Sequence, residues 1–196
     1  CALPIFDIRK SEGKIVRLQE LVARDPLAGT CGVGHTRWAT HGRPSDRNAH
    51  PHKTGSVAVV HNGIIENHRA LKDRLAGLGR AFQSETDTEV IAHLLDGFLA
   101  AGFSLEESTR KTVSELHGSY AFLAISETEP GTIVGARMNC PMVVGIGEGE
   151  TFLASDLPPL LSHTRHAVFL EDGEIAVASR NGVRLTDFRG DLREHK

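Results

Sequence analysis

The sequence predicts a single α+β domain, because helical patterns fill its first half and short strands fill its second half. The change falls near Gly118, after which apolar runs become short and are separated by turn residues. With 196 residues, the chain is long enough to bury one substantial hydrophobic core. Hydrophobic residues make up 40% of it and charged residues 24%, as in ordinary globular proteins.

Two helices are predicted from apolar spacing alone. Residues 14–25 form the first, which ends before Pro26. The second begins near Asn67 and stops at Gly79. Their apolar faces are Ile15, Leu18, Leu21 and Val22 in the first helix, and Leu71, Leu75 and Leu78 in the second.

Two further helices are predicted from capping boxes, in which the first and fourth residues bind each other's backbone N–H groups. Thr86 with Glu89 starts one, and Ser104 with Glu107 starts the other. Each box precedes apolar residues at helical spacing: Val90, Ile91, Leu94, Leu95 and Phe98 after the first, and Leu105, Val113 and Leu116 after the second.

Strands are predicted from short apolar runs bounded by Gly, Pro or Asp-Gly. One run, 57–60, leads directly into His61-Asn62-Gly63. Asp172-Gly173 predicts a tight hairpin turn between two later strands, because glycine accepts a positive φ. The later strands are expected at 120–126, 132–137, 142–146, 152–155, 167–170 and 174–178.

Charge and cysteine content exclude several classes of protein. The formal net charge is −3 and no basic stripe stands out, which argues against a nucleic-acid partner. No apolar run approaches the roughly 18 residues of a membrane helix, and no signal-peptide pattern opens the chain. The three cysteines, Cys1, Cys31 and Cys140, are odd in number and widely spaced, so a reducing compartment, by default the cytoplasm, is expected.

Four polar blocks lie close together, at 35–42, 48–52, 61–67 and 84–88. In the third, the Asn62 side-chain amide and the Gly63 backbone N–H can converge on one oxyanion, and glycine lets the backbone come close to a substrate. Asn-Gly alone is a common hairpin turn. An apolar strand before it and a helix after it favour the oxyanion site.

The first and fourth blocks suggest groups that hold the two ends of an amino acid. The planar fork of Arg37 suits a carboxylate. Asp87 can accept a hydrogen bond from an ammonium, although a helix cap is the alternative. Trp38 is a pocket wall or a core residue, and Thr40 and His41 offer short-range hydrogen bonds.

Cys1 is a candidate nucleophile. An N-terminal amine has a pKa of about 8, against roughly 10 for lysine, so it can take the thiol proton near neutral pH. Nucleophile and base then lie on one residue. The alternative is that Cys1 marks only the start of a fragment.

Cys1 and the four blocks together resemble the glutaminase domain of the glutamine–fructose-6-phosphate aminotransferases, which are class II glutamine amidotransferases with an N-terminal nucleophile. The resemblance covers about Gly13 to Arg193. It implies a four-layer αββα sandwich, spanning 1–196 as one glutaminase domain. The family's opening strand, its next helix and an Arg-bearing loop have no match in the first dozen residues.

The resemblance also implies a function and a site. The expected reaction is hydrolysis of L-glutamine to L-glutamate and ammonia through a Cys thioester, without a cofactor. Cys1, Asn62 and Gly63 match the catalytic positions. Arg37, Trp38, Thr40, His41 and Asp87 match the glutamine-binding positions, with Trp38 on a mobile loop. In the family, the ammonia passes to a sugar-phosphate isomerase domain that uses fructose 6-phosphate.

Other interpretations stay open. The chain could be a partial or degenerate domain that binds glutamine without catalysis. It could be a zinc hydrolase that uses His50 and His52, although the histidine spacing fits no common site. A sister amidotransferase with another acceptor, such as phosphoribosyl pyrophosphate, is a further option. The sequence does not decide whether the chain forms a homo-oligomer.

Overall fold

The computed structural model describes residues 6–37 and 42–195, and it confirms the α+β class with two antiparallel sheets. The six-stranded sheet has the order β1-β2-β3-β4-β8-β9, and the three-stranded sheet has the order β6-β5-β7. In chain order the elements are α1 (Ile15–Arg24), β1 (His52–Thr54), β2 (Val57–Ile65), α2 (His68–Gly77), α3 (Glu89–Ala100), α4 (Leu105–Val113), β3 (Gly118–Ser126), β4 (Thr132–Met138), β5 (Val143–Ile146), β6 (Thr151–Ala154), a 3-10 turn (Pro158–Leu160), β7 (His166–Phe169), β8 (Glu174–Ser179) and β9 (Gly182–Asp187).

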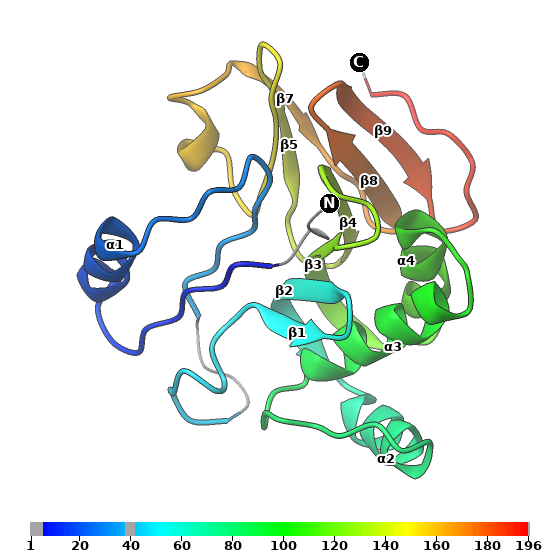
Figure 1. Cartoon of the computed structure of the whole chain (residues 1–196). Coiled ribbons are helices and arrows are strands. Elements are labelled where there is room, and N and C mark those ends of the chain that lie inside the picture. The colour runs from blue at the N-terminus through cyan, green and yellow to red at the C-terminus, as the bar shows by residue number, and fades with distance from the viewer. Residues whose placement is uncertain (1–5, 38–41, 196) are drawn as a thin grey trace.

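The six-stranded sheet separates two hydrophobic cores. Helices α2, α3 and α4 cover one of its faces, where Val57, Val59 and Ile65 of β2 pack with α3 (Figure 1). The other face carries Ala121 and Leu123 of β3, which pack against the three-stranded sheet. Successive residues of a strand point to opposite faces, so the position of a residue along β2 decides which core it meets.

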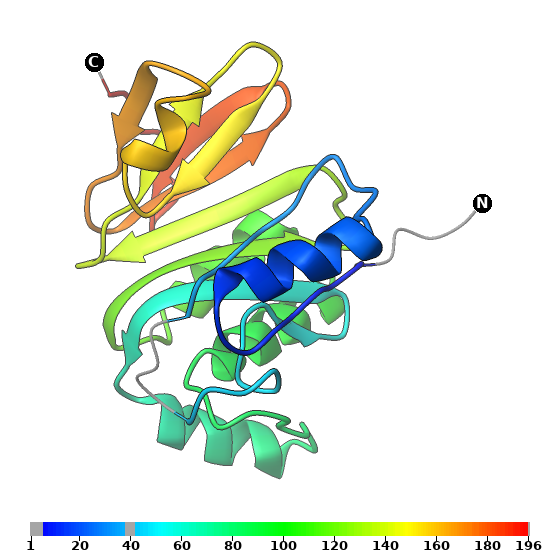
Figure 2. The ribbon, with the colours of Figure 1, turned by 90° about the vertical axis from the view of Figure 1, so that its left-hand side faces the viewer.

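The remaining helix, α1, is confirmed at the predicted residues but is not part of either core. None of its residues is buried, and Ile15 is 59% exposed. It lies on the side of the six-stranded sheet opposite to α2–α4 (Figure 2). The longest helix in the described ranges, α3, has 12 residues, and no described helix is long and apolar enough to cross a membrane.

One capping prediction is confirmed and one is wrong. Ser104 and Glu107 form the predicted box at the start of α4. Thr86 and Glu89 do not, because the N-cap of α3 is Thr88, which makes no side-chain cap. Glu89 instead accepts hydrogen bonds from the backbone N–H groups of Gln83 and Ser84. The spacing of Thr86 and Glu89 fits a capping box, but the Glu89 carboxylate binds the loop before the helix instead.

The predicted hairpin at Asp172-Gly173 is also wrong. Gly173 has the expected positive φ of +81°, but the strands that it joins belong to different sheets. β7 pairs with β5, and β8 pairs with β4 and β9. A turn signal shows where the chain reverses and not which strands then pair.

Two strands and one helix face were not predicted correctly. β1 has three residues, two of them His52 and Lys53, and β9 mixes apolar with polar side chains. Neither has the apolar run that marked the other strands. Leu78, expected on the buried face of α2, lies just past the helix and is 75% exposed.

The paired ends of β2 and β3 are packed backbone to backbone. Gly63 and Gly118 both have positive φ, at +114° and +123°. A Cβ on Gly63 would lie 2.1 Å from the Ser119 carbonyl oxygen, and one on Gly118 would lie 2.3 Å from that of Ile64. Only glycine fits at these two positions.

We therefore expect Gly118→Ala to lower the free energy of unfolding by at least about 2 kcal/mol, because it adds overpacking to backbone strain. Urea denaturation followed by circular dichroism measures the change. The control is Gly77→Ala, at the end of α2, where no atom lies within 4 Å of the added Cβ. That variant should be as stable as the wild type or slightly more so. Equal stabilities for the two variants would contradict the packing argument.

Candidate functional site

Residues from all four polar blocks line one cavity of about 330 Å³. Within the described residues, β1 pairs only with the first three residues of β2, and the cavity lies beside the edge of β2 that this leaves open. Four residues singled out from the sequence meet there: Arg37, Asn62, Gly63 and Asp87. The lining is completed by His35, His50, His61, Ile64, Thr86 and Thr88.

Asn62 and Gly63 lie within β2, since the strand runs on to Ile65. Asn62 pairs with Ala121 of β3, so its side chain lies on the face opposite to α2–α4. It is exposed, and its Oδ1 is 2.8 Å from Nε2 of His35. The amide is therefore presented to the cavity and has one fixed partner.

The backbone N–H of Gly63 points to the same open edge of β2. On either side of it along the strand, the N–H of His61 donates to Nδ1 of His50 at 3.3 Å, and that of Ile65 donates to Oδ2 of Asp87 at 2.8 Å. Alternate N–H groups of a strand point in the same direction. The geometry thus brings a side-chain amide and a backbone N–H to one cavity. The glycine itself is required by contact with β3 and not only by approach to a ligand.

Asp87 is buried, at 3% exposure, in the loop before α3. Its hydrogen bond from the Ile65 N–H fixes the carboxylate relative to β2. The neighbouring threonines bind histidines: Thr86 Oγ1 is 3.1 Å from Nε2 of His52, and Thr88 Oγ1 is 2.9 Å from Nδ1 of His61. The loop is thus joined to β1 and β2 through side chains.

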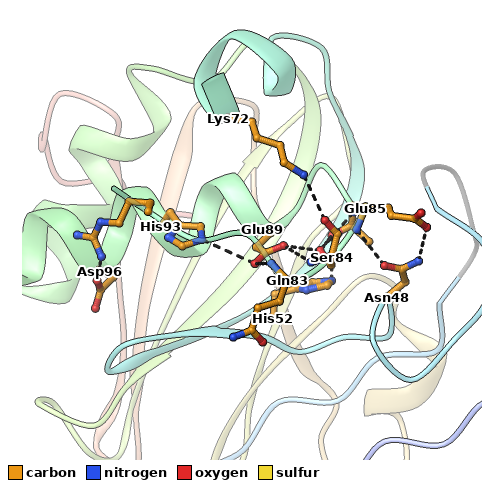
Figure 3. A network of polar contacts seen from close by, with 11 residues as sticks. Asn48, His52, Lys72, Gln83, Ser84, Glu85, Glu89, His93 and Asp96 are labelled. Carbon is orange, nitrogen blue, oxygen red and sulfur yellow. Dashed lines mark hydrogen bonds and ion pairs between the residues drawn. The ribbon is translucent and has the colours of Figure 1, made fainter. Parts of the chain in front are cut away.

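A network of polar contacts also stabilises the loop that carries Asp87 (Figure 3). Glu89 is buried and accepts from the N–H groups of Gln83 and Ser84, each at 2.7 Å, and from the Ser84 hydroxyl at 2.6 Å. Burial alone would raise the pKa of Glu89, but the nearby His93 ring, 3.7 Å away, and the hydrogen bonds from Ser84 and the two N–H groups outweigh it and lower the pKa to about 2. Glu89 is therefore ionised at neutral pH.

Asn48, from the second block, joins the same loop to the segment that follows the first block (Figure 3). Its Oδ1 accepts from the Glu85 N–H at 3.0 Å, and its Nδ2 donates to the Glu85 carboxylate and to the Arg43 carbonyl, both at 3.0 Å. A Cβ on Gly42 would lie 2.7 Å from Nδ2 of Asn48, so this contact requires glycine there. This role of Asn48 was not predicted from the sequence.

Arg37 lies at the rim of the cavity. Its guanidinium donates to the carbonyl oxygens of Gly42 at 2.6 Å and Arg43 at 3.0 Å. These bonds orient the planar group, which suits a carboxylate by its geometry. The other expected site residues, Cys1, Trp38, Thr40 and His41, lie outside the described residues.

The histidines of the site interact with one another and with polar side chains. The rings of His35 and His50 are stacked with centroids 4.1 Å apart, and His52 meets His50 edge-on at 5.0 Å. Burial is the main cause that lowers the pKa of each: strongly for His50, to about 4 for His52, and in the same direction for His35. The cluster is neutral at pH 7.

The zinc interpretation is not favoured. Within 6–37 and 42–195, no group of three or more His, Cys, Asp or Glu side chains is arranged to hold a metal ion. His52, half of the predicted pair, binds Thr86 instead. Cys31 and Cys140 are half-buried free thiols.

Comparison with known proteins gives consistent matches. A family model described as "Glutamine amidotransferase domain" matches residues 35–162. The glutamine–fructose-6-phosphate aminotransferase (isomerizing) of Methanothermobacter thermautotrophicus is 47% identical over 193 residues, which are 97% of this chain and 32% of that protein. The Thermus thermophilus protein of the same name is 49% identical over 183 residues, covering 92% and 30%. The chain thus spans about a third of the length of these relatives.

Among solved structures, the glutamine phosphoribosylpyrophosphate amidotransferase of B. subtilis, complexed with ADP and GMP, superposes with a TM-score of 0.67. It is 28% identical, and the match covers 81% of this chain and 35% of that one. A class-II glutamine aminotransferase domain protein from Silicibacter pomeroyi, at 16% identity and a TM-score of 0.51, shares the fold.

The Glu89 network generates a prediction about acid stability. Because the pKa of Glu89 is lower in the folded chain than its ordinary value of 4.5, its ionisation stabilises the fold above about pH 4.5 and this contribution is lost as the pH falls toward 2. Glu89→Gln should lower the free energy of unfolding at pH 7 by about 1–3 kcal/mol, because the buried N–H groups lose their charged acceptor.

Urea denaturation at a series of pH values between 7 and 2.5 measures both effects. The stability of Glu89→Gln should fall less steeply below pH 4.5 than that of the wild type. The control is Glu148→Gln, an exposed carboxylate near β6, which should leave the profile unchanged. Parallel pH profiles for Glu89→Gln and the wild type would contradict the role given to Glu89.

Proposed function

The chain belongs to the glutamine amidotransferase family, and on that premise we propose that it hydrolyses the side-chain amide of L-glutamine to give L-glutamate and ammonia. One observation carries the proposal. Arg37, Asn62-Gly63 and Asp87 come from three separate blocks of sequence and line one cavity. They are the groups needed to hold an α-amino acid and to stabilise an oxyanion.

The chemistry follows from the groups at the open edge of β2. The Cys1 thiol, deprotonated by its own α-amine, would attack the side-chain amide carbon. The carbonyl oxygen then becomes an oxyanion, which the Asn62 amide and the Gly63 N–H would stabilise by hydrogen bonds. Collapse of this tetrahedral intermediate releases ammonia, which takes the proton from the amine. Water then hydrolyses the γ-glutamyl thioester.

The two ends of glutamine would be held by opposite charges. The α-carboxylate would bind the guanidinium of Arg37, and the α-ammonium would bind Asp87, whose carboxylate is fixed by Ile65. Trp38, Thr40 and His41 would complete the pocket. With both charged ends bound, the side-chain amide is the part of glutamine left to react.

The acceptor of the ammonia is proposed from the relatives. Their identity of 47–49% exceeds the 28% of the phosphoribosylpyrophosphate enzyme, which favours the fructose-6-phosphate branch. Residues 1–196 would then be the glutaminase domain of a longer cytoplasmic enzyme, in which a sugar-phosphate isomerase domain makes glucosamine 6-phosphate.

Glutamate release from glutamine by the purified chain tests the reaction. Cys1→Ala should abolish it, and Asn62→Ala should lower kcat by about 10²–10³-fold, the usual loss of one oxyanion donor. No glutamate from the folded wild-type chain, together with measurable glutamine binding by calorimetry, would support the non-catalytic alternative. Activity that survives in Cys1→Ala would contradict the assignment of the nucleophile.

The proposed binding of the α-ammonium by Asp87 can be tested with a substrate that lacks the α-amino group. Glutaramic acid is glutamine without its α-amino group, so the wild type should use it at least about 10-fold less well in kcat/KM, in line with loss of a charged hydrogen bond. Asp87→Asn should have a lower kcat/KM for glutamine and little preference between the two substrates. The control, Asp73→Asn at an exposed position of α2, should keep the preference. An undiminished preference in Asp87→Asn would show that the ammonium is bound elsewhere.

A further inference from the structure

The two ends of the Asn62 side chain have opposite chemistry. Nδ2 carries two N–H donors, and Oδ1 can only accept. Rotation of the amide by 180° exchanges them with almost no change in shape. An oxyanion would be stabilised by Nδ2 and repelled by Oδ1, so the orientation of this amide decides whether the residue helps or hinders the reaction.

Packing around Asn62 does not select the orientation. The residue is exposed, and besides the site it borders a second cavity, of about 260 Å³, which Leu123 and Met142 also line. An amide in such a place would rotate easily if nothing bound one of its ends. The selection has to come from a hydrogen bond.

His35 provides that bond. Its Nε2 lies 2.8 Å from Oδ1 of Asn62. Oδ1 faces His35, and because Oδ1 cannot donate, Nε2 has to carry the proton in this contact. The other neutral tautomer would instead accept from Nδ2 and turn Oδ1 toward the cavity. Burial lowers the pKa of His35, which keeps the ring neutral. The tautomer of His35 and the orientation of the amide are thus coupled: with the proton on Nε2, Oδ1 stays at His35 and Nδ2 is left to face the reacting amide.

His35 is itself held in place. Its ring stacks on that of His50 at 4.1 Å with an interplanar angle of 29°. His50 in turn accepts the N–H of His61, the residue before Asn62, at 3.3 Å. The His61 ring binds Thr88 at 2.9 Å from the other face of the strand. Two stacked imidazoles therefore contact two consecutive residues of β2, one through its backbone and the other through its side chain.

We propose that His35 is a positioning residue, which holds Oδ1 of Asn62 so that Nδ2 faces the reacting amide. The proposal rests on the proposed glutamine hydrolysis and adds a residue that acts on the reaction through Asn62. His50 supports it by fixing the plane of the His35 ring.

Two substitutions separate the hydrogen bond from packing. His35→Phe keeps a flat ring that can stack on His50 but loses the donor. His35→Gln loses the ring but can place an amide N–H near the position of Nε2. We expect kcat to fall about 10- to 100-fold in His35→Phe, less than on complete loss of an oxyanion donor, with KM nearly unchanged. His35→Gln should regain most of kcat, and His163→Phe, at an exposed histidine, should match the wild type.

A double-mutant cycle tests whether His35 acts through Asn62. In an Asn62→Ala background, His35→Phe should cause little further loss of kcat, because the group that it positions is already gone. Independent losses that multiply in the double variant would overturn the proposal. So would a pattern in which His35→Phe is active and His35→Gln is not, since that pattern indicates packing alone.

A spectroscopic measurement keeps the test independent of turnover. The side-chain NH₂ signal of Asn62 can be assigned by its disappearance in Asn62→Ala, and its ¹⁵N order parameter reports motion of the amide. It should be high in the wild type and His35→Gln and lower in His35→Phe. An equally ordered amide in His35→Phe would overturn the proposal even if the chain released no glutamate. If the chain released no glutamate but the order parameter of the Asn62 amide changed as predicted, the result would contradict the proposed reaction and not the positioning role of His35.

Discussion

The close contact of β2 with β3 is the constraint on which the candidate site depends. At the end of the pair, two glycines allow the backbones to approach to a distance that no side chain would permit. β2 runs on past the last partner of β1, so in the part of the chain that the structure describes no strand pairs with the outer edge of its final residues. The backbone N–H groups of that edge meet His50 and Asp87, and the candidate oxyanion site lies between them.

Polar contacts, in addition to the packing of α3 in the core, bring the remaining parts of the site to this edge. Glu89 holds the loop that carries Asp87, and Asn48 joins that loop to the segment beside Arg37. Buried polar groups are costly unless satisfied, so these contacts specify one arrangement where apolar packing would tolerate several. Much of the first and second blocks of sequence therefore serves to position the few groups that can contact a ligand.

The sequence predicted the class of fold and the neighbourhood of the site, because apolar spacing and short polar blocks are local signals. It failed where a partner distant in sequence decided the outcome. Glu89 has capping-box spacing but binds the loop before it. Asp172-Gly173 turns the chain between sheets, which no local pattern distinguishes from a hairpin. His35 is part of the first block, but no local pattern indicates its contact with Asn62, because the two residues are 27 positions apart in the sequence.

The alternation of β2 also limits how the sequence can change. His61 and Asn62 are adjacent, yet one binds the helix-side loop and the other faces the cavity. Insertion or deletion of one residue between Val57 and His61 would exchange the two faces and bring the amide into the helical core. Changes of length in this strand are therefore tolerated only in steps of two. Loops such as the one between β5 and β6 carry no such restriction, so related sequences should vary in length there and keep β2 constant.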